Sequence, residues 1–167
     1  NLDRQGPVAV LNIGGVANIT YIDGDTLIAC DTGPGNALLD DFMLRATGEA
    51  VDRDGHHAKH GAVDPSWIEQ ALTHPFFNAP PPKSLDRNDF AAFTVQGTTT
   101  ENGAATLTAF TAASIAKIAD VLPKPPSNWI VVGGGANNPT LMAMLADRLA
   151  PASVMRGSDL GWMGDAI

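Results

Sequence analysis

The chain has 167 residues, of which 44% are hydrophobic and 6% aromatic, and its formal net charge is −8. This length and composition suit one soluble α/β domain with a core of its own. The negative charge argues against nucleic acid and anionic membrane as partners, because both select basic surfaces. The single cysteine, Cys30, allows no intrachain disulfide, which fits a cytoplasmic location.

Three strands are predicted at the start of the chain. An apolar, β-branched run covers residues 8–13, and two further apolar-rich segments cover 18–22 and 26–30. Asp23-Gly24 separates the second from the third, which is a strong hairpin signal. We therefore expect a three-stranded antiparallel meander.

Two glycine-rich turns follow the first and third of these strands. They read GGVAN (14–18) and DTGPGN (31–36). Glycines after strands permit positive φ or the close approach of a ligand, and successive exposed N–H groups form anion sites. Asn36 is expected to cap a helix over 37–46 that ends at Gly48, with its N-terminus favouring negative charge. The alternative is two tight turns that use glycine for geometry alone.

A cluster of histidines follows, at positions 56, 57 and 60. Two histidines four residues apart could share a helix face and bind a metal. However, Gly55 and Gly61 interrupt helical order, and no carboxylate or cysteine completes a ligand set at metal spacing. We expect His56, His57 and His60 to face solvent.

A proline-rich segment over 79–90 reads APPPKSLDRNDF. Its stiff, extended prolines would hold Lys83, Ser84 and Arg87 at a fixed place. A plain proline loop with two surface cations is an equally good interpretation. A short helix starting at Asp64-Pro65 precedes this segment, and a long amphipathic helix over 102–122 follows it.

Near the C-terminal end, a strand over 129–132 runs directly into three glycines. Asn138 then caps a helix that has Pro139 at its first position, and a last strand is expected over 152–155. Strand, glycine turn and helix start together form the architecture of a nucleotide-binding turn. Three glycines would let a base or ribose lie against the backbone, whereas a plain turn needs only one.

The motifs LNIGGVANIT, DTGPGN, PPKS and GGG-x-x-NP, in this order, resemble the anhydro-N-acetylmuramic acid kinase family, which has the actin-like sugar kinase fold. SDLGWMGD (158–165) is similar to the family's end pattern, whereas Leu85 and Asp86 depart from its commoner form. The resemblance implies an α/β fold, with one actin-like ATPase (ribonuclease H-like) domain whose three-stranded antiparallel meander packs with helices. Residues 1–167 would be the C-terminal half of a two-domain kinase, without its N-terminal phosphate-loop domain and final helix.

The resemblance also implies ATP-dependent phosphorylation of 1,6-anhydro-N-acetylmuramic acid to N-acetylmuramic acid 6-phosphate in peptidoglycan recycling, in the cytoplasm. Asp31 would organise Mg²⁺ through water, and the general base is expected upstream, so no catalytic residue lies in this chain and the fragment alone should be inactive. The residues expected at ATP and its phosphates are Gly14, Gly15, Asn18, Gly133, Gly134, Gly135 and Asn138. Those expected at the substrate or phosphate are Asp31, Thr32, Gly33, Gly35, Asn36 and Lys83.

Two other classes of protein are alternatives. A non-catalytic actin-like module would hold nucleotide without transferring phosphate. A dinucleotide-dependent oxidoreductase is disfavoured, because the triple glycine lacks the G-x-G-x-x-G spacing and no acidic residue follows about 20 residues later at a strand end. The partners expected are ATP and a small sugar, with no nucleic acid and no membrane, and a homodimer stays open.

Overall fold

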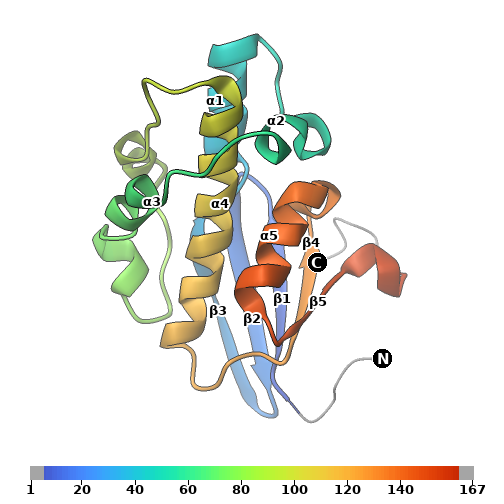
Figure 1. Ribbon diagram of the computed structural model, residues 1–167. Helices are drawn as coiled ribbons and strands as arrows, with labels where there is room; N and C mark the ends of the chain where they lie inside the picture. Colours follow the sequence, from blue (N-terminus) through green and yellow to red (C-terminus); the bar gives the residue numbers. More distant parts are fainter. Residues whose placement is uncertain (1–5, 162–167) are drawn as a thin grey trace.

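The computed structural model describes residues 6–161, apart from the side chain of Arg87. Its centre is a five-stranded mixed sheet with the order β3-β2-β1-β4-β5 (Figure 1). β1 pairs antiparallel with β2, and β2 with β3, so the predicted meander is confirmed. β4 runs parallel to both β1 and β5. The strands are β1 (Val8–Ile13), β2 (Val16–Asp23), β3 (Thr26–Pro34), β4 (Asn128–Val132) and β5 (Ser153–Arg156).

Every second residue of β1 and β2 is buried. This alternation arises because successive side chains of a strand point to opposite faces. Leu11 and Ile19 join the core beneath the helices, whereas Asn12 and Asn18 belong to the opposite face. The helices lie on one face of the sheet (Figure 1), and we call the other face the open face.

The helices form two apolar clusters on the covered face. One lies between the sheet, α4 and α5, and the other joins α1, α3 and α4. The helices are α1 (Ala37–Thr47), α2 (His56–Lys59), α3 (Pro65–Ala71), α4 (Thr100–Ile118) and α5 (Pro139–Leu149). Short 3-10 turns cover Arg53–Gly55, Pro75–Asn78, Arg87–Ala92, Ala119–Val121, Gly134–Asn137 and Gly157–Leu160.

α4 is buried on all sides rather than along one stripe, because it lies between the two clusters. Every residue from 103 to 115 is buried. The helix is long and apolar enough by composition to cross a membrane, but 72% of its most apolar window is buried inside the protein. Small residues make this packing possible: a Cβ on Gly103 would lie 2.2 Å from the Phe42 ring.

Two predicted helix boundaries are confirmed by their local chemistry. Gly48 ends α1 with φ of 80°, a conformation that glycine adopts without strain. Asp64 caps α3 by accepting a hydrogen bond from Trp67 N at 3.2 Å. The end pattern at 158–165 lies partly outside the described residues, which stop at position 161.

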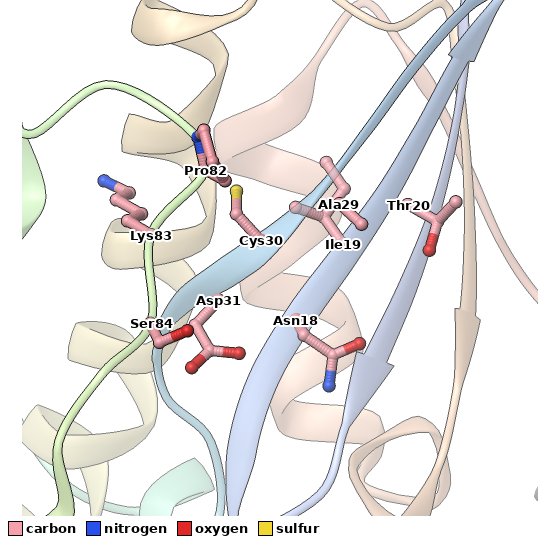
Figure 2. Close-up of a pocket in the computed structure, with 9 residues that line it drawn as sticks. All are labelled: Asn18, Ile19, Thr20, Ala29, Cys30, Asp31, Pro82, Lys83 and Ser84. Carbon is pink, nitrogen blue, oxygen red and sulfur yellow. The ribbon is translucent and has the colours of Figure 1, made fainter.

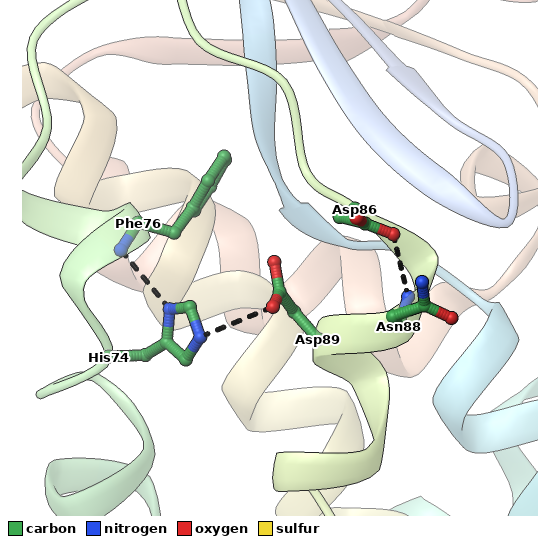
Figure 3. A network of polar contacts seen from close by, with 5 residues as sticks. All are labelled: His74, Phe76, Asp86, Asn88 and Asp89. Carbon is green, nitrogen blue, oxygen red and sulfur yellow. Dashed lines mark hydrogen bonds and ion pairs between the residues drawn. The ribbon is translucent and has the colours of Figure 1, made fainter.

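Polar contacts join the turn before the proline-rich segment to the C-terminal end of that segment (Figure 3). The His74 Nδ1 accepts a hydrogen bond from Phe76 N at 3.1 Å, and its Nε2 lies 3.9 Å from Asp89 Oδ1. Asp86 accepts from Asn88 N at 2.9 Å and caps the following turn. His74 therefore has a structural role in this network.

Candidate functional site

The two glycine turns form one unit at the end of the sheet. Gly35 N donates to Gly15 O at 2.9 Å, Asn36 N to Gly14 O at 2.7 Å, and Ala37 N to Gly15 O at 3.2 Å. These backbone donors at the start of α1 are therefore paired within the chain. The expectation that they form an open anion site is not met in this structure.

Asn36 does not cap α1 as predicted. It occupies the N-cap position with helical φ and ψ of −85° and −13°, and its side chain accepts no capping hydrogen bond. Its Nδ2 instead donates to Ile13 O at 3.3 Å. The side chain thus fastens the start of the helix to the end of β1, a tertiary contact that local sequence does not encode.

β3 extends through the first part of DTGPGN instead of ending at Cys30. Its pairing with β2 continues to Pro34 past a bulge between Ala17 and Asn18. Strand alternation then places Asp31 on the open face and turns Thr32 into the core, where it is 1% exposed. Gly33 is buried too, and a Cβ there would approach Phe77 at 3.0 Å.

Two glycines of the triple-glycine bend are required by packing against β1. Gly133 has φ of 84°, and a Cβ on it would lie 2.4 Å from Asn12 Oδ1. A Cβ on Gly135 would lie 2.4 Å from the Ile13 side chain. Gly134 is different, because it is exposed and its nearest neighbour would be Asn36 Nδ2 at 3.7 Å. Of these three glycines, only Gly134 can therefore contact a ligand without also being required for packing.

A hollow of about 330 Å³ opens beside Gly134, and we call it the sheet-end hollow. Asn138 reaches it while capping α5, because Leu141 N donates to its Oδ1 at 3.0 Å, so the predicted cap is confirmed. Burial raises the pKa of the Asp40 carboxyl to about 6, and the nearby Asp41 charge adds to this. The lining residues are Asn36, Leu39, Asp40, Val51, Asp52, Arg53, Asp54, Gly134, Asn137 and Asn138.

A second hollow of about 580 Å³ lies on the open face, and we call it the sheet-face hollow (Figure 2). The segment around Lys83 closes one side, because Asp31 N donates to Lys83 O at 3.0 Å and Leu85 N donates to Asp31 Oδ2 at 2.8 Å. The lining residues are Asn18, Ile19, Thr20, Ala29, Cys30, Asp31, Pro82, Lys83 and Ser84.

The Lys83 ammonium already has interaction partners within the chain. Its Nζ donates to Phe76 O at 2.9 Å and lies 4.6 Å from the centre of the Phe76 ring. Burial lowers the pKa of this ammonium. Figure 2 shows the side chain directed away from Asp31. The Lys83 backbone therefore lies at the sheet-face hollow, whereas its ammonium group interacts with Phe76.

The histidine cluster has no ligand geometry. His56 and His60 are exposed, and within residues 6–161 no group of three His, Cys, Asp or Glu side chains could hold a metal ion. The buried Asp52 organises this segment by accepting from His57 N at 2.9 Å and Ala58 N at 3.0 Å. Gly55 lets it dock on α5, where Thr140 Oγ1 donates to Gly55 O at 2.9 Å.

Six of the thirteen predicted site residues line the two hollows, and seven line neither: Gly14, Gly15, Thr32, Gly33, Gly35, Gly133 and Gly135. Asn36, Gly134 and Asn138 line the sheet-end hollow, whereas Asn18, Asp31 and Lys83 line the sheet-face hollow. Sequence reasoning missed Asp40 and Asn137 at the first of these.

The sheet order and its helices define the actin-like ATPase fold. A solved structure of the activator of the 2-hydroxyisocaproyl-CoA dehydratase from Clostridium difficile, with bound ADPNP, matches 89% of this chain and 53% of that chain, with a TM-score of 0.52 and 15% identity. Component A of the Acidaminococcus fermentans (R)-2-hydroxyglutaryl-CoA dehydratase matches with a TM-score of 0.54 and 12% identity, over 89% of this chain and 54% of that chain. These likenesses show the fold alone.

The chain belongs to the anhydro-N-acetylmuramic acid kinase family, whose family model matches residues 2–167. It is 63% identical over 168 residues to the anhydro-N-acetylmuramic acid kinase of Nitrobacter winogradskyi, and 62% identical to that of Rhodopseudomonas palustris strain BisB18. Each match covers 100% of this chain and 46% of the relative. The chain thus spans about half the length of these relatives, and its place as their C-terminal half stays a prediction.

Proposed function

We propose that the protein containing this chain transfers a phosphoryl group from ATP to 1,6-anhydro-N-acetylmuramic acid while water opens the anhydro ring. The product is N-acetylmuramic acid 6-phosphate, and the reaction serves peptidoglycan recycling in the cytoplasm. Support comes from the relatives, which are named anhydro-N-acetylmuramic acid kinases, and from a protein of the same fold that is recorded with bound ADPNP.

One observation carries the proposal: the three glycine-containing segments meet at one end of the sheet. Gly14 O accepts from Asn36 N, and a Cβ on Gly134 would lie 3.7 Å from Asn36 Nδ2. Segments more than 100 residues apart in the chain therefore converge on Asn36. An actin-like kinase needs such convergence, because phosphoryl transfer depends mainly on positioning and charge stabilisation.

The charges in the two hollows indicate which end of the nucleotide each would take. The sheet-end hollow is lined by three carboxyl groups, Asp40, Asp52 and Asp54, and by one guanidinium, Arg53. The excess of carboxyl groups disfavours phosphate and offers acceptors to hydroxyl or amino groups. This hollow therefore suits the adenosine, which would lie against Gly134. The phosphates would pass Gly14, Gly15 and Asn18, and the sugar would lie near Asp31 and Ser84.

Asp31 also fits a magnesium site that is completed by water. Its Oδ2 accepts from Leu85 N, and its other carboxylate oxygen is available on the side of the sheet-face hollow. Mg²⁺ is usually held in nucleotide sites by one or two carboxylates, several waters and the phosphates themselves. When bound, the ion would neutralise charge on the phosphates; Asp31 and Asn18 would hold its water shell.

Ring opening requires a carboxylate that activates water. We propose that this base comes from the part of the relatives' length that the chain does not span, so that the isolated 167 residues do not turn over substrate. An assay of catalysis therefore needs the whole protein.

The test is to express the whole protein and incubate it with ATP and the anhydro sugar. Mass spectrometry should detect ADP and a sugar product that has gained one phosphoryl group and one water. ADP without that product, or no ADP at all, would overturn the assignment. Nucleotide binding without any ADP formation would favour the non-catalytic module, and rapid turnover by the isolated chain would refute the proposed division of the site.

A further inference from the structure

A series of contacts leads from His74 to Asp31 across the proline-rich segment. Phe76 N donates to His74 Nδ1 at 3.1 Å, and Phe76 O accepts from Lys83 Nζ at 2.9 Å. Lys83 O in turn accepts from Asp31 N at 3.0 Å, and Asp31 Oδ2 accepts from Leu85 N at 2.8 Å. The attachment of the segment to β3 therefore depends on Phe76, and the orientation of Phe76 depends on His74.

The N–H of Phe76 needs an acceptor from outside its own turn. Phe76 is the second residue of the 3-10 turn Pro75–Asn78, and the first N–H groups of a helical turn have no acceptor within it. The residue is 8% exposed, so an unpaired N–H there would be costly. In the described part of the chain, His74 Nδ1 is the acceptor that this N–H has.

The opposite side of the His74 ring faces a carboxylate. Nε2 lies 3.9 Å from Asp89 Oδ1, which belongs to the C-terminal end of the proline-rich segment (Figure 3). The other described neighbours of the ring, such as Gln70 of α3 and the rings of Phe77 and Phe93, do not titrate near neutral pH. Among the described side chains, Asp89 is thus the titratable group that faces His74.

The two nitrogens of the ring have opposite requirements. Nδ1 accepts a hydrogen bond from Phe76 N only while it carries no proton, so the structure corresponds to the neutral imidazole with its proton on Nε2. In the imidazolium both nitrogens are donors, so the charged ring cannot hold Phe76 N and is attracted to Asp89 instead. The side chain is 24% exposed, so protons reach it, and histidine is the residue whose charge ordinarily changes between about pH 5 and 8.

We propose that neutral His74 is a positioning residue for Asp31, and that protonation of His74 releases the proline-rich segment from β3. The neutral ring holds Phe76, Phe76 holds Lys83, and Lys83 holds the backbone of Asp31. Because Asp31 and Ser84 line the sheet-face hollow, this hollow is assembled above neutral pH and loosened in acid. The inference rests on the proposed function only where it connects this hollow with the sugar.

Hydrogen–deuterium exchange of the whole protein, without ligands, tests the release. In His74→Asn the side-chain oxygen accepts from Phe76 N but does not titrate, whereas His74→Ala has no acceptor at any pH. Comparison with the parent at the same pH cancels the intrinsic pH dependence of exchange. At about pH 8, residues 79–86 should exchange alike in the parent and His74→Asn, and about fivefold faster in His74→Ala. At about pH 5.5 the parent should exchange like His74→Ala.

His60→Asn is the matched control. His60 follows α2 and is exposed, so this variant should exchange like the parent over residues 79–86 at both pH values. Equal exchange of the parent and His74→Asn at both pH values would overturn the inference, as would equal exchange of His74→Ala and His74→Asn. Should His74→Ala not fold, the parent and His74→Asn still decide, because only the parent titrates at this position.

The connection with the sugar has a measurement of its own, which is the KM of the whole protein for the anhydro sugar. Between about pH 8 and pH 5.5, we expect the KM of the parent to rise about fivefold relative to that of His74→Asn, with kcat much less affected. The same pH dependence of KM in both proteins would overturn the positioning role. Absence of phosphorylation would count against the proposed function alone, since the exchange measurement needs neither nucleotide nor sugar.

Discussion

The two hollows are built in different ways. The sheet-end hollow is framed by backbone: glycines with no room for a Cβ at Gly35, Gly133 and Gly135, and hydrogen bonds between N–H and C=O groups of the turns. The sheet-face hollow is framed by side chains on strand faces and by a proline-rich segment that Asp31 and Lys83 fasten. Substitutions at the first should therefore act on folding, except at Gly134, whereas those at the second should act on local order and binding.

The largest effect is expected from Gly35→Ala. The new Cβ would lie 2.2 Å from Gly14 O, a backbone atom that cannot move without opening the turn. We expect the free energy of unfolding of the whole protein to fall by about 3 kcal/mol, as for severe overpacking. Urea unfolding measures this, with Gly134→Ala as the matched control that should change nothing. Equal stability of the two variants would contradict the view that backbone packing frames this end.

Asp31→Ala should loosen the proline-rich segment. The substitution leaves the partly buried Leu85 N without its acceptor, which costs about 2 kcal/mol locally. Limited proteolysis should then cleave within residues 79–86 faster than in the parent, while the cleavage rate elsewhere stays the same. Asp25→Ala, an exposed carboxylate on the same hairpin, should leave the pattern unchanged. Protection of 79–86 in the Asp31 variant would show that other contacts hold the segment.

Gly134→Phe should separate binding from stability at the sheet-end hollow. Gly134 is exposed and has a negative φ, so a side chain fits without a clash but covers the surface proposed for adenosine. We expect the ATP dissociation constant to rise at least tenfold, which is about 1.4 kcal/mol, with the unfolding midpoint unchanged. Unchanged ATP affinity would contradict the proposal that adenosine binds at this bend.

The smallest effect concerns the pH dependence of Asp40. Burial raises its pKa from 3.8 to about 6 in the folded chain, so between these values the folded state holds the proton more tightly than the unfolded state. Stability from this group is therefore full below about pH 4 and falls as pH rises to 6. The loss should be about 1 kcal/mol, allowing for solvent screening of a half-exposed group. Urea midpoints from pH 4 to 7 should fall less steeply in Asp40→Asn; parallel curves would contradict the assignment.

Local chemistry was readable from the sequence. The meander, the αL glycine at position 48 and the caps at Asp64 and Asn138 each depend on a few neighbouring residues, and each is confirmed. The order of family motifs also identified the family, which the matches confirm. The caps and the helix end at Gly48 are local because each hydrogen bond closes within three or four residues, and the meander is local because its strands are consecutive in the chain.

Tertiary hydrogen bonding was not readable in the same way. The sequence predicts Asn36 as a helix cap, yet its side chain donates a hydrogen bond to Ile13 O instead. The sequence predicts that the N–H groups after Gly33 form an anion site, yet these groups donate to carbonyls of the first turn. The stripe predicted for α4 was too narrow, because elements distant in the chain cover its other side. In the first two examples the hydrogen-bond partner lies at least 20 residues away.

One turn of α4 contacts both halves of the glycine-rich strand end. Thr111 Oγ1 donates to Gly35 O at 3.0 Å, and three residues later Ser114 would lie 3.1 Å from a Gly33 Cβ. The long helix therefore fixes the positions of Gly33 and Gly35, on either side of Pro34. Because α4 is buried along most of its length, the backbone after β3 should keep its position when ligands bind.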